Sequence, residues 1–313
     1  MFPLLLISCK GPVTTDISEE KNRHDSLIDS QKDLQKTTPQ QEKIPNDNLV
    51  PLFYPGQLCH WIRGIYEDSK GNLWFGTNHY GVMRYNGRIL QYFTEKEGFG
   101  GNRVSGIAED DEGNLWFGTT GGLTKFNGES FEIYSEKEGL LDNWISTMTL
   151  DSKGQIWVGT MDGLNIFDGS SFETLAIPKP QIEKPEPILS HNRITSILED
   201  KNGIMWIGTD GYGICKYDGQ EFTHITTENG LADNNIAQIW QDSQGDVWVG
   251  TMFGGVSHFT NDAVTNYHAV GIIKLVEAVG FYEDRAGNIW FAVEGDCIYR
   301  FDGKNFVNYN EDD

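Results

Sequence analysis

The sequence predicts an all-β protein, a β-propeller of six four-stranded blades in preference to seven, and three observations support this fold. A segment centred on tryptophan recurs six times, and the successive tryptophans are 42, 41, 49, 42 and 42 residues apart. A period near 42 residues with four strand-like segments is the size of one propeller blade. The chain has 36 glycines among 313 residues and is 12% aromatic, which suits short strands joined by tight turns. The recurrent tryptophans are Trp74, Trp116, Trp157, Trp206, Trp248 and Trp290.

Each predicted blade begins with a strand marked by an apolar pair, such as Ile62 and Ile65, and continues into an Asp-x-x-Gly turn. The aspartate can accept hydrogen bonds within its own turn, and the glycine tolerates the positive φ that closes it. One such turn offers too few oxygen ligands for calcium, so we expect neither a metal site nor a cofactor. The turns lie at residues 68–71, 110–113, 151–154, 200–203, 242–245 and 284–287.

The second strand of each blade is an uninterrupted apolar run around its tryptophan, which is typical of a strand buried on both faces. We therefore interpret the tryptophans as core residues, and stacking against a ligand is the alternative. An Asn-Gly or Asp-Gly pair then predicts a two-residue type I′ hairpin between the third and fourth strands. These pairs begin at Asn86, Asn127, Asp168, Asp218 and Asp302, whereas Asn261-Asp262 takes their place in the fifth copy.

The unit from Ile62 to Thr77 reads Ile-x-x-Ile-x-Glu-Asp-x-x-Gly-Asn-Leu-Trp-Phe-Gly-Thr and resembles the two-component regulator propeller repeat. The loops at 138–143 and 229–234 fit the same repeat, and the resemblance extends over residues 57–313. In that family such repeats form the periplasmic sensor region of hybrid histidine kinases, often ones that respond to products of polysaccharide breakdown. This sequence shows no kinase or receiver segment and no apolar stretch of 18 residues. The resemblance therefore implies ligand recognition without a kinase of its own.

The predicted topology places two sets of loops on one face of the ring, around the mouth of the central channel: those between second and third strands, and those entering each first strand. These loops differ between copies, whereas the turns on the opposite face hardly vary. Aromatic faces can cover sugar C–H groups, while arginine and aspartate bond hydroxyls or carboxylates. We predict a site for an oligosaccharide or peptide; the alternatives are a docked partner protein and loops that vary because nothing constrains them. The candidate ligand-binding residues are Trp61, His79, Tyr80, Arg103, Trp144, Asp162, Arg193, Asp210, Tyr212, Phe253 and Glu294.

One proline-rich insertion, residues 178–190, breaks the period and accounts for the 49-residue spacing. Proline stiffens such a segment in an extended form. It projects from the same face as the candidate site. A lip over the channel, a docking segment and a tolerated surface insertion are the three interpretations.

The segment Leu6-Ile7-Ser8-Cys9 resembles the bacterial lipobox, whose cysteine is acylated. We expect residues 1–9 to be the remnant of a lipoprotein signal whose true start lies upstream, and Cys9 to carry the lipid. Residues 10–48 are polar and predict a disordered tether, and residues 49–313 form the propeller. The protein would then lie in the periplasm or on the outer membrane, held to the membrane by its lipid alone. The alternative is a chance apolar start on a cytosolic protein.

The formal net charge of −22 argues against a nucleic-acid partner and favours a soluble monomer. The remaining cysteines, Cys59, Cys215 and Cys297, show no disulfide framework or metal spacing, although a pair between Cys59 and Cys297 stays open. Residues 52–54 resemble a fourth strand that would close the ring with the last blade.

No nucleophile elbow, zinc-protease motif or phosphate-binding loop occurs in the sequence. The sequence therefore favours a binding module over an enzyme. The alternative is a propeller lyase or hydrolase that acts on a polysaccharide or lactone through a metal at the channel mouth.

Overall fold

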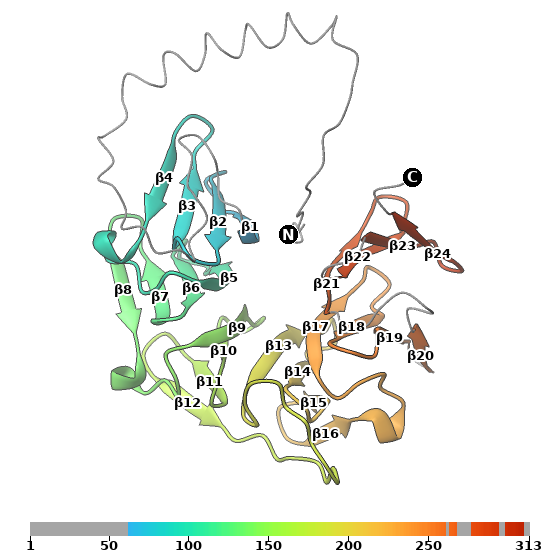
Figure 1. Ribbon diagram of the computed structural model, residues 1–313. Helices are drawn as coiled ribbons and strands as arrows, with labels where there is room; N and C mark the ends of the chain where they lie inside the picture. The colour runs from blue at the N-terminus through green and yellow to red at the C-terminus, as the bar shows by residue number, and fades with distance from the viewer. Residues whose placement is uncertain (1–61, 261–262, 268–276, 294–297, 310–313) are drawn as a thin grey trace, which may run out of the picture. The chain divides into compact units, whose positions relative to one another are not determined.

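The computed structural model describes residues 62–260, 263–267, 277–293 and 298–309, which form six antiparallel four-stranded sheets (Figure 1). Each sheet keeps its strands in chain order, so each predicted blade is one sheet and the six-bladed propeller is confirmed. The first three blades contain β1 (Ile62–Glu67), β2 (Leu73–Thr77), β3 (Val82–Tyr85), β4 (Leu90–Phe93), β5 (Val104–Glu109), β6 (Leu115–Thr119), β7 (Gly122–Phe126), β8 (Phe131–Tyr134), β9 (Ile145–Leu150), β10 (Ile156–Thr160), β11 (Leu164–Phe167) and β12 (Phe172–Leu175). The last three contain β13 (Ile194–Glu199), β14 (Met205–Thr209), β15 (Ile214–Tyr217), β16 (Phe222–Ile225), β17 (Ile236–Gln241), β18 (Val247–Thr251), β19 (Val256–Phe259), β20 (Val264–Tyr267), β21 (Ala278–Glu283), β22 (Ile289–Val293), β23 (Ile298–Phe301) and β24 (Phe306–Tyr309).

Helical structure in the described residues is limited to three single 3-10 turns, each of which follows the fourth strand of a blade. None of these turns is long and apolar enough to cross a membrane. The turns are η1 (Glu95–Glu97), η2 (Glu136–Glu138) and η3 (Thr227–Asn229).

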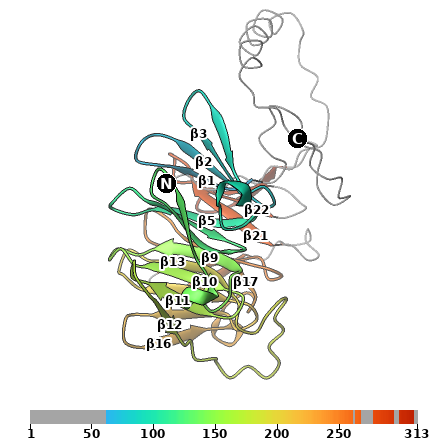
Figure 2. The same cartoon turned by 90° about the vertical axis from the view of Figure 1, so that its left-hand side faces the viewer.

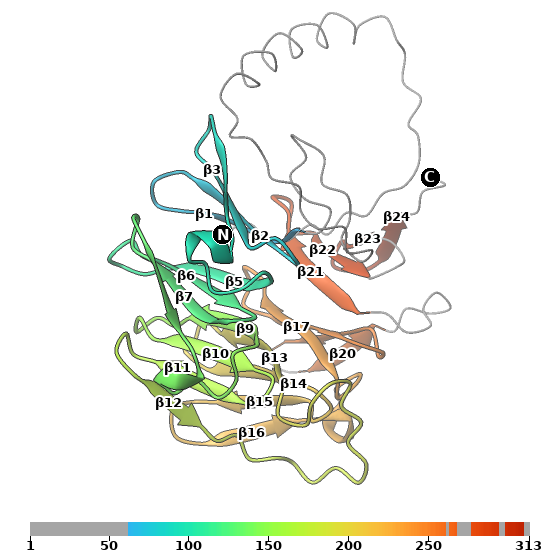
Figure 3. The same ribbon diagram turned by 60° about the vertical axis from the view of Figure 1, so that its left-hand side comes forward.

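The first strands of neighbouring blades lie next to one another, from β1 and β5 through to β17 and β21. Figures 2 and 3 show β9 beside β13 in two further views. The first strand is therefore the innermost strand of each blade. This order brings the entrances of the six first strands toward a common centre.

The second strands form the core, as their apolar runs predict. All positions of β6, β10, β14 and β18 are buried, and five of the six recurrent tryptophans are at most 5% exposed. The exception is Trp290 of the last blade, which is partly exposed. The interpretation of the tryptophans as core residues is thus confirmed for five blades, with the sixth less completely covered.

The Asp-x-x-Gly turns do more than close themselves. In the first blade Asp68 Oδ1 accepts the backbone N–H groups of Lys70 and Asn72, as predicted, and its Oδ2 accepts the indole N–H of Trp74 at 2.8 Å. All six turns bond their tryptophan in this way, at 2.8 to 2.9 Å. The repeated aspartate therefore satisfies the one polar group of the buried indole, which explains why the two residues recur together.

Neighbouring blades are also joined on the face that carries the Asp-x-x-Gly turns, which we call the turn face. The carboxylate of Glu199, at the end of β13, accepts the backbone N–H and the hydroxyl of Ser152 from the preceding blade at 2.6 and 2.7 Å. Glu109 and Glu283 accept the same pair of bonds from Ser69 and Ser243. These bonds connect residues 40 to 47 positions apart, so their partners are not evident from local sequence.

The hairpins between third and fourth strands differ by one residue from the prediction. The backbone N–H of Asn86 donates to Ile89 O, so the two central residues are Gly87 and Arg88 rather than Asn86 and Gly87. Gly87 has a φ of +87°, and the Asn86 side chain accepts the N–H groups of Arg88 and Ile89. The asparagine thus caps the hairpin instead of forming its first corner.

Several sequence predictions fall on residues outside the described ranges: the lipid-bearing Cys9, the tether at 10–48, the ring-closing segment at 52–54, Cys59, Cys297 and the Asn261-Asp262 pair. Cys215, on β15, is buried with a free thiol. Burial raises the pKa of this thiol to about 12, so it behaves as a core residue.

Candidate functional site

The loops between second and third strands are hydrogen-bonded to the segments that enter the first strands, which confirms that both lie on one face. Thr120 N–H donates to Arg103 O at 3.2 Å, Met161 N–H to Trp144 O at 3.2 Å and Asp210 N–H to Arg193 O at 3.3 Å. We refer to these loops and entering segments as the loop face. The three entering residues, Arg103, Trp144 and Arg193, are therefore held at equivalent places in successive blades.

Arg103 and Trp144 form a cationic and aromatic pair on the loop face. The Arg103 guanidinium lies 6.0 Å from the centre of the Trp144 ring, and its Nε donates to Asn78 Oδ1 at 3.2 Å. The Trp144 side chain is 45% exposed, an unusual position for an indole in a fold that buries most of the others. A cation above an exposed aromatic ring gives one surface that can contact both a charged group and an apolar one.

Charged side chains of other blades also act on Arg103. Burial is the main cause that lowers the pKa of Arg103 to about 10, and the positive charges of Arg63 and Arg193 act in the same direction, while Glu277 opposes them. These four side chains come from blades 1, 2, 4 and 6, so the entering segments do converge across the channel. Arg103 remains charged at neutral pH, and its positive charge is held in a place where water screens it poorly.

Arg63 joins these charges through a β-bulge. The pairing of β1 with β2 shifts between Ile62 and Gly64, which leaves Arg63 as the extra residue. The same irregularity occurs in blades 2 to 5, where the extra residue is small: Ser105, Ser146, Thr195 or Ala237. A bulge redirects one side chain, and only the first blade places an arginine there. Arg63 was not predicted as a site residue, because a bulge depends on strand pairing and leaves no local pattern in the sequence.

Asp210 has a different position from the one expected of a ligand contact. It is 1% exposed, its carboxylate lies 3.7 Å from Arg193 Nη1, and it accepts the backbone N–H groups of Ile188, Leu189 and Ser190 at 2.7, 2.9 and 3.3 Å. Its hydrogen-bonding capacity is therefore used to hold the end of the insertion against blade 4. The end of the insertion is thus anchored to blade 4, and its role as a lip, a docking segment or a tolerated insertion stays a prediction.

Beneath the insertion, between blades 3 and 4, lies a cavity of about 260 Å³. Tyr212 and His191 meet on its wall with 2.9 Å between Oη and Nδ1, and Lys179 Nζ lies 5.1 Å from the centre of the Tyr212 ring. Arg193 and His224 also line this cavity. The Nε of Arg193 and the Nε2 of His224 are buried and have no hydrogen-bond partner. Burial lowers the pKa of His224, which favours its neutral form. The lining of the cavity is mostly apolar, and its charged side chains are Asp162, Lys179 and Arg193.

The other candidate residues are dispersed. Asp162 accepts a hydrogen bond at 2.7 Å from Asn192, which follows the insertion, and His79 contacts its neighbour Asn78 with 3.0 Å between Nε2 and Nδ2. Tyr80 donates its backbone N–H to Thr77, and Phe253 stands 51% exposed on the blade 5 loop. Trp61 and Glu294 lie outside the described residues. The structure therefore brings together Arg103 with Trp144, and Asp162 with Arg193 and Tyr212 around the cavity; a contact of any of them with ligand stays a prediction.

Comparison with known proteins identifies the repeat. The model of the two component regulator propeller matches residues 56–79, 98–121, 139–162 and 188–211. The chain carries two-component regulator propeller repeats. Each of the four matches contains one Asp-x-x-Gly turn and the first two strands of a blade, so the regulator propeller repeats fall on blades 1 to 4 as described above. No curated protein matches the chain.

Solved structures share the fold at low sequence identity. The extracellular domain of a putative hybrid two-component system from B. thetaiotaomicron aligns at a TM-score of 0.64 and 20% identity, over 80% of this chain and 36% of that one. A virginiamycin B lyase from Staphylococcus aureus aligns at 0.59 and 21%, over 76% and 79%. PorZ of Porphyromonas gingivalis, a surface component of the type-IX secretion system, aligns at 0.60 and 16%, over 83% and 43%. This chain thus spans about a third of that extracellular domain, with which it shares the propeller fold.

Proposed function

We propose that this propeller is an extracytoplasmic, lipid-anchored binding protein whose loop face recognises a carboxylate-bearing oligosaccharide, with no reaction of its own. The observation that carries the proposal is the Arg103–Trp144 pair, set within the field of Arg63 and Arg193. A fixed guanidinium binds a carboxylate through paired charge-assisted hydrogen bonds, and an exposed indole covers the apolar face of a sugar ring.

The charge distribution supports an anionic ligand. The whole chain carries a formal net charge of −22, yet the positive charges of Arg63 and Arg193 both act on Arg103, and Lys179 lines the neighbouring cavity. Like charges held together are destabilising unless an opposite charge joins them, and Glu277 is the acidic side chain that acts on Arg103. A ligand carboxylate would add a second negative charge at the same place. The relation of the regulator propeller repeats to sensor domains is consistent with recognition as the function.

The test uses the full chain and isothermal titration with a panel of uronic-acid and sulfated oligosaccharides. Each acidic ligand is paired with a neutral counterpart of the same length, such as the methyl ester of an oligogalacturonate. We expect at least one acidic member to bind and its neutral counterpart to bind at least about tenfold more weakly, since a charge-assisted hydrogen bond contributes about 1.5–3 kcal/mol. Binding should also weaken as salt is raised.

Two variants and one control assign the site. Arg103→Gln and Trp144→Ala should each lower affinity about tenfold or more. The control, Arg285→Gln, makes the same charge change on an exposed turn of the opposite face and should leave affinity unchanged. Equal affinities of Arg103→Gln and Arg285→Gln, or no binding of any acidic member of the panel, would contradict the proposal. A new product detected by mass spectrometry would replace it with the lyase function.

The lipid anchor is tested separately. The chain is fused behind the basic and apolar segments of a bacterial lipoprotein signal and expressed in a Gram-negative host with labelled palmitate. We expect the label in the wild type and in Cys59→Ser, and its loss in Cys9→Ser. Absence of label from the wild type, or label that persists in Cys9→Ser, would contradict lipid attachment at Cys9 while leaving the ligand site unaffected.

A further inference from the structure

Blade 5 departs from the other blades at two positions, and both departures introduce a residue that can bind a metal ion. Asp246 immediately precedes the second strand, where the other blades have Asn72, Asn114, Gln155, Ile204 and Asn288. His258 pairs with the recurrent tryptophan, where the other blades have Arg84, Lys125, Ile166, Lys216 and Arg300. The two positions are 12 residues apart in sequence, and strand pairing brings them together.

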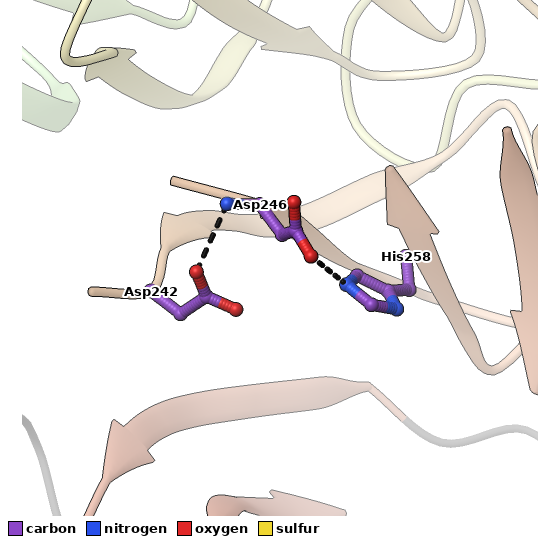
Figure 4. Close-up of side chains that lie close together, drawn as sticks. All are labelled: Asp242, Asp246 and His258. Atoms are coloured by element: carbon purple, nitrogen blue, oxygen red, sulfur yellow. Dashed lines mark hydrogen bonds and ion pairs between the residues drawn. The ribbon is translucent and has the colours of Figure 1, made fainter. Parts of the chain in front are cut away.

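Figure 4 shows Asp246 and His258 pointing toward one another, with the carboxylate of Asp242 beside them. His258 Nε2 lies 3.2 Å from Asp246 Oδ2. One ligand atom from each of Asp242, Asp246 and His258 lies within 4.8 Å of the other two, and all three residues are partly exposed. An ion from solvent can therefore reach the group without opening the core.

The three side chains are held in place but keep free lone pairs. Asp242 Oδ1 accepts the backbone N–H groups of Gln244, Gly245 and Asp246, whereas its Oδ2 accepts only the indole N–H of Trp248. The His258 ring stacks on Trp248, with 3.9 Å between ring centroids and an interplanar angle of 12°. These contacts orient the imidazole and leave its Nε2 edge facing Asp246.

In four other blades a permanent cation covers the tryptophan face: Arg84, Lys125, Lys216 and Arg300 lie 4.2 to 5.8 Å from the ring centres. Histidine can occupy the same place as a neutral ring and then bind a metal through Nε2, which arginine and lysine cannot do. An aspartate in place of asparagine adds the negative charge that a divalent ion requires. The two changes are thus chemically complementary.

We propose that Asp242, Asp246 and His258 bind a divalent transition-metal ion, for which zinc is the probe. Ligand bonds of about 2.0–2.2 Å at tetrahedral angles place ligand atoms about 3.4 Å apart, close to the observed separation of Asp246 and His258. An imidazole with carboxylates favours zinc over calcium or magnesium. A solvent molecule completes the coordination. The turn alone offers too few ligands, as the sequence analysis concluded; the strand pairing supplies the third.

The ion would connect the first turn of blade 5 to β18 and β19, on the side of the blade opposite the loop face. This role is structural and independent of ligand binding at the loop face. Metal binding should therefore raise the melting temperature of the full chain, by about 3 °C or more at saturating zinc.

The test is titration of the chelator-treated full chain with zinc and, separately, with calcium. We expect one equivalent of zinc to bind, and Asp246→Asn and His258→Lys each to weaken binding at least tenfold. Both substitutions restore residues that blade 2 carries at these positions, so the fold tolerates them. The reverse change in blade 2, Asn114→Asp combined with Lys125→His, should add a second equivalent.

Three results would overturn the proposal: a wild type that binds no zinc, variants that bind zinc as tightly as the wild type, and calcium binding that His258→Lys leaves unchanged. The second result would assign the zinc to other histidines of the chain. The loss variants keep the proposal open to refutation even if the blade 2 double variant does not fold.

Discussion

The two faces of the propeller use similar residues for different purposes. On the turn face, six aspartates repeat the same contacts: each closes its turn and accepts the indole N–H of the following tryptophan. On the loop face the equivalent positions vary between blades, and an exposed Trp144 stands beside a cationic Arg103. Repetition in this chain therefore follows the need to satisfy buried polar groups. Where that need is absent, the side chains are free to serve recognition.

The contrast is not complete, because Asp210 on the loop face is as buried as any turn aspartate. We expect Asp210→Ala to lower the free energy of unfolding by about 3 kcal/mol, since it leaves Arg193 without its buried partner. It also releases three backbone N–H groups of the insertion. Urea unfolding measures the loss, and cleavage by a glutamate-specific protease at Glu183 measures the release. Asp162→Ala, an exposed change on the same face, should stay within about 0.5 kcal/mol; equal effects of the two would show that the anchor is unimportant.

The turn face itself is tested by Asp200→Ala. We expect a loss of about 2–3 kcal/mol, because the indole N–H of Trp206 is left buried without a partner and the turn loses its cap. Thermal and chemical unfolding measure the change. Asp218→Ala, at an exposed hairpin, removes comparable backbone bonds but no buried partner and should cost clearly less. If the two variants are equally stable, the aspartate–tryptophan bond does not explain the repeat.

The bonds between blades should have a smaller effect. Glu199→Ala removes two hydrogen bonds from Ser152 at a partly exposed junction, and we expect a loss of about 1 kcal/mol. Glu173→Ala on the outer strand β12 makes the same change without such a partner and is the control. A cost for Glu199→Ala no larger than that for Glu173→Ala would mean that the junction is held by apolar packing alone.

The smallest expected effect is the loss of stability in acid that comes from the turn aspartates. Burial tends to raise the pKa of Asp68 and Asp110, but the hydrogen bonds from tryptophan, asparagine and the backbone outweigh it and lower the pKa below the usual 3.8. A lowered folded pKa adds stability that is present above about pH 4 and is lost as the pH falls through the folded value. Carboxyl NMR titration should therefore place both groups below 3.8, with a parallel fall in melting temperature; titration of Asp68 at or above 3.8 would contradict this account.

Much of the fold could be read locally. The tryptophan runs, the Asp-x-x-Gly turns and the Gly-containing hairpins each report on a few consecutive residues, and the structure confirms their places, with the hairpin corner shifted by one residue. The candidate site was read less completely. Arg103 and Trp144 were identified because their loops vary, whereas Arg63 and Lys179 were missed, since a bulge and an anchored insertion bring them to the site. Asp210 is the converse case. An aspartate in a variable loop was predicted to contact a ligand, whereas in the structure its side chain is buried and anchors the insertion.

The number of blades, the order of their strands and the face on which variation gathers can be predicted from the sequence, because turn chemistry and apolar runs act over a few residues and recur with a period. Which polar groups meet depends on the folded arrangement of the blades. Arg193 finds Asp210, Glu199 finds Ser152, and His258 finds Asp246 through strand register and the packing of one blade on the next. These pairings depend on distances between segments that are remote along the chain, and no local pattern of residues specifies such distances.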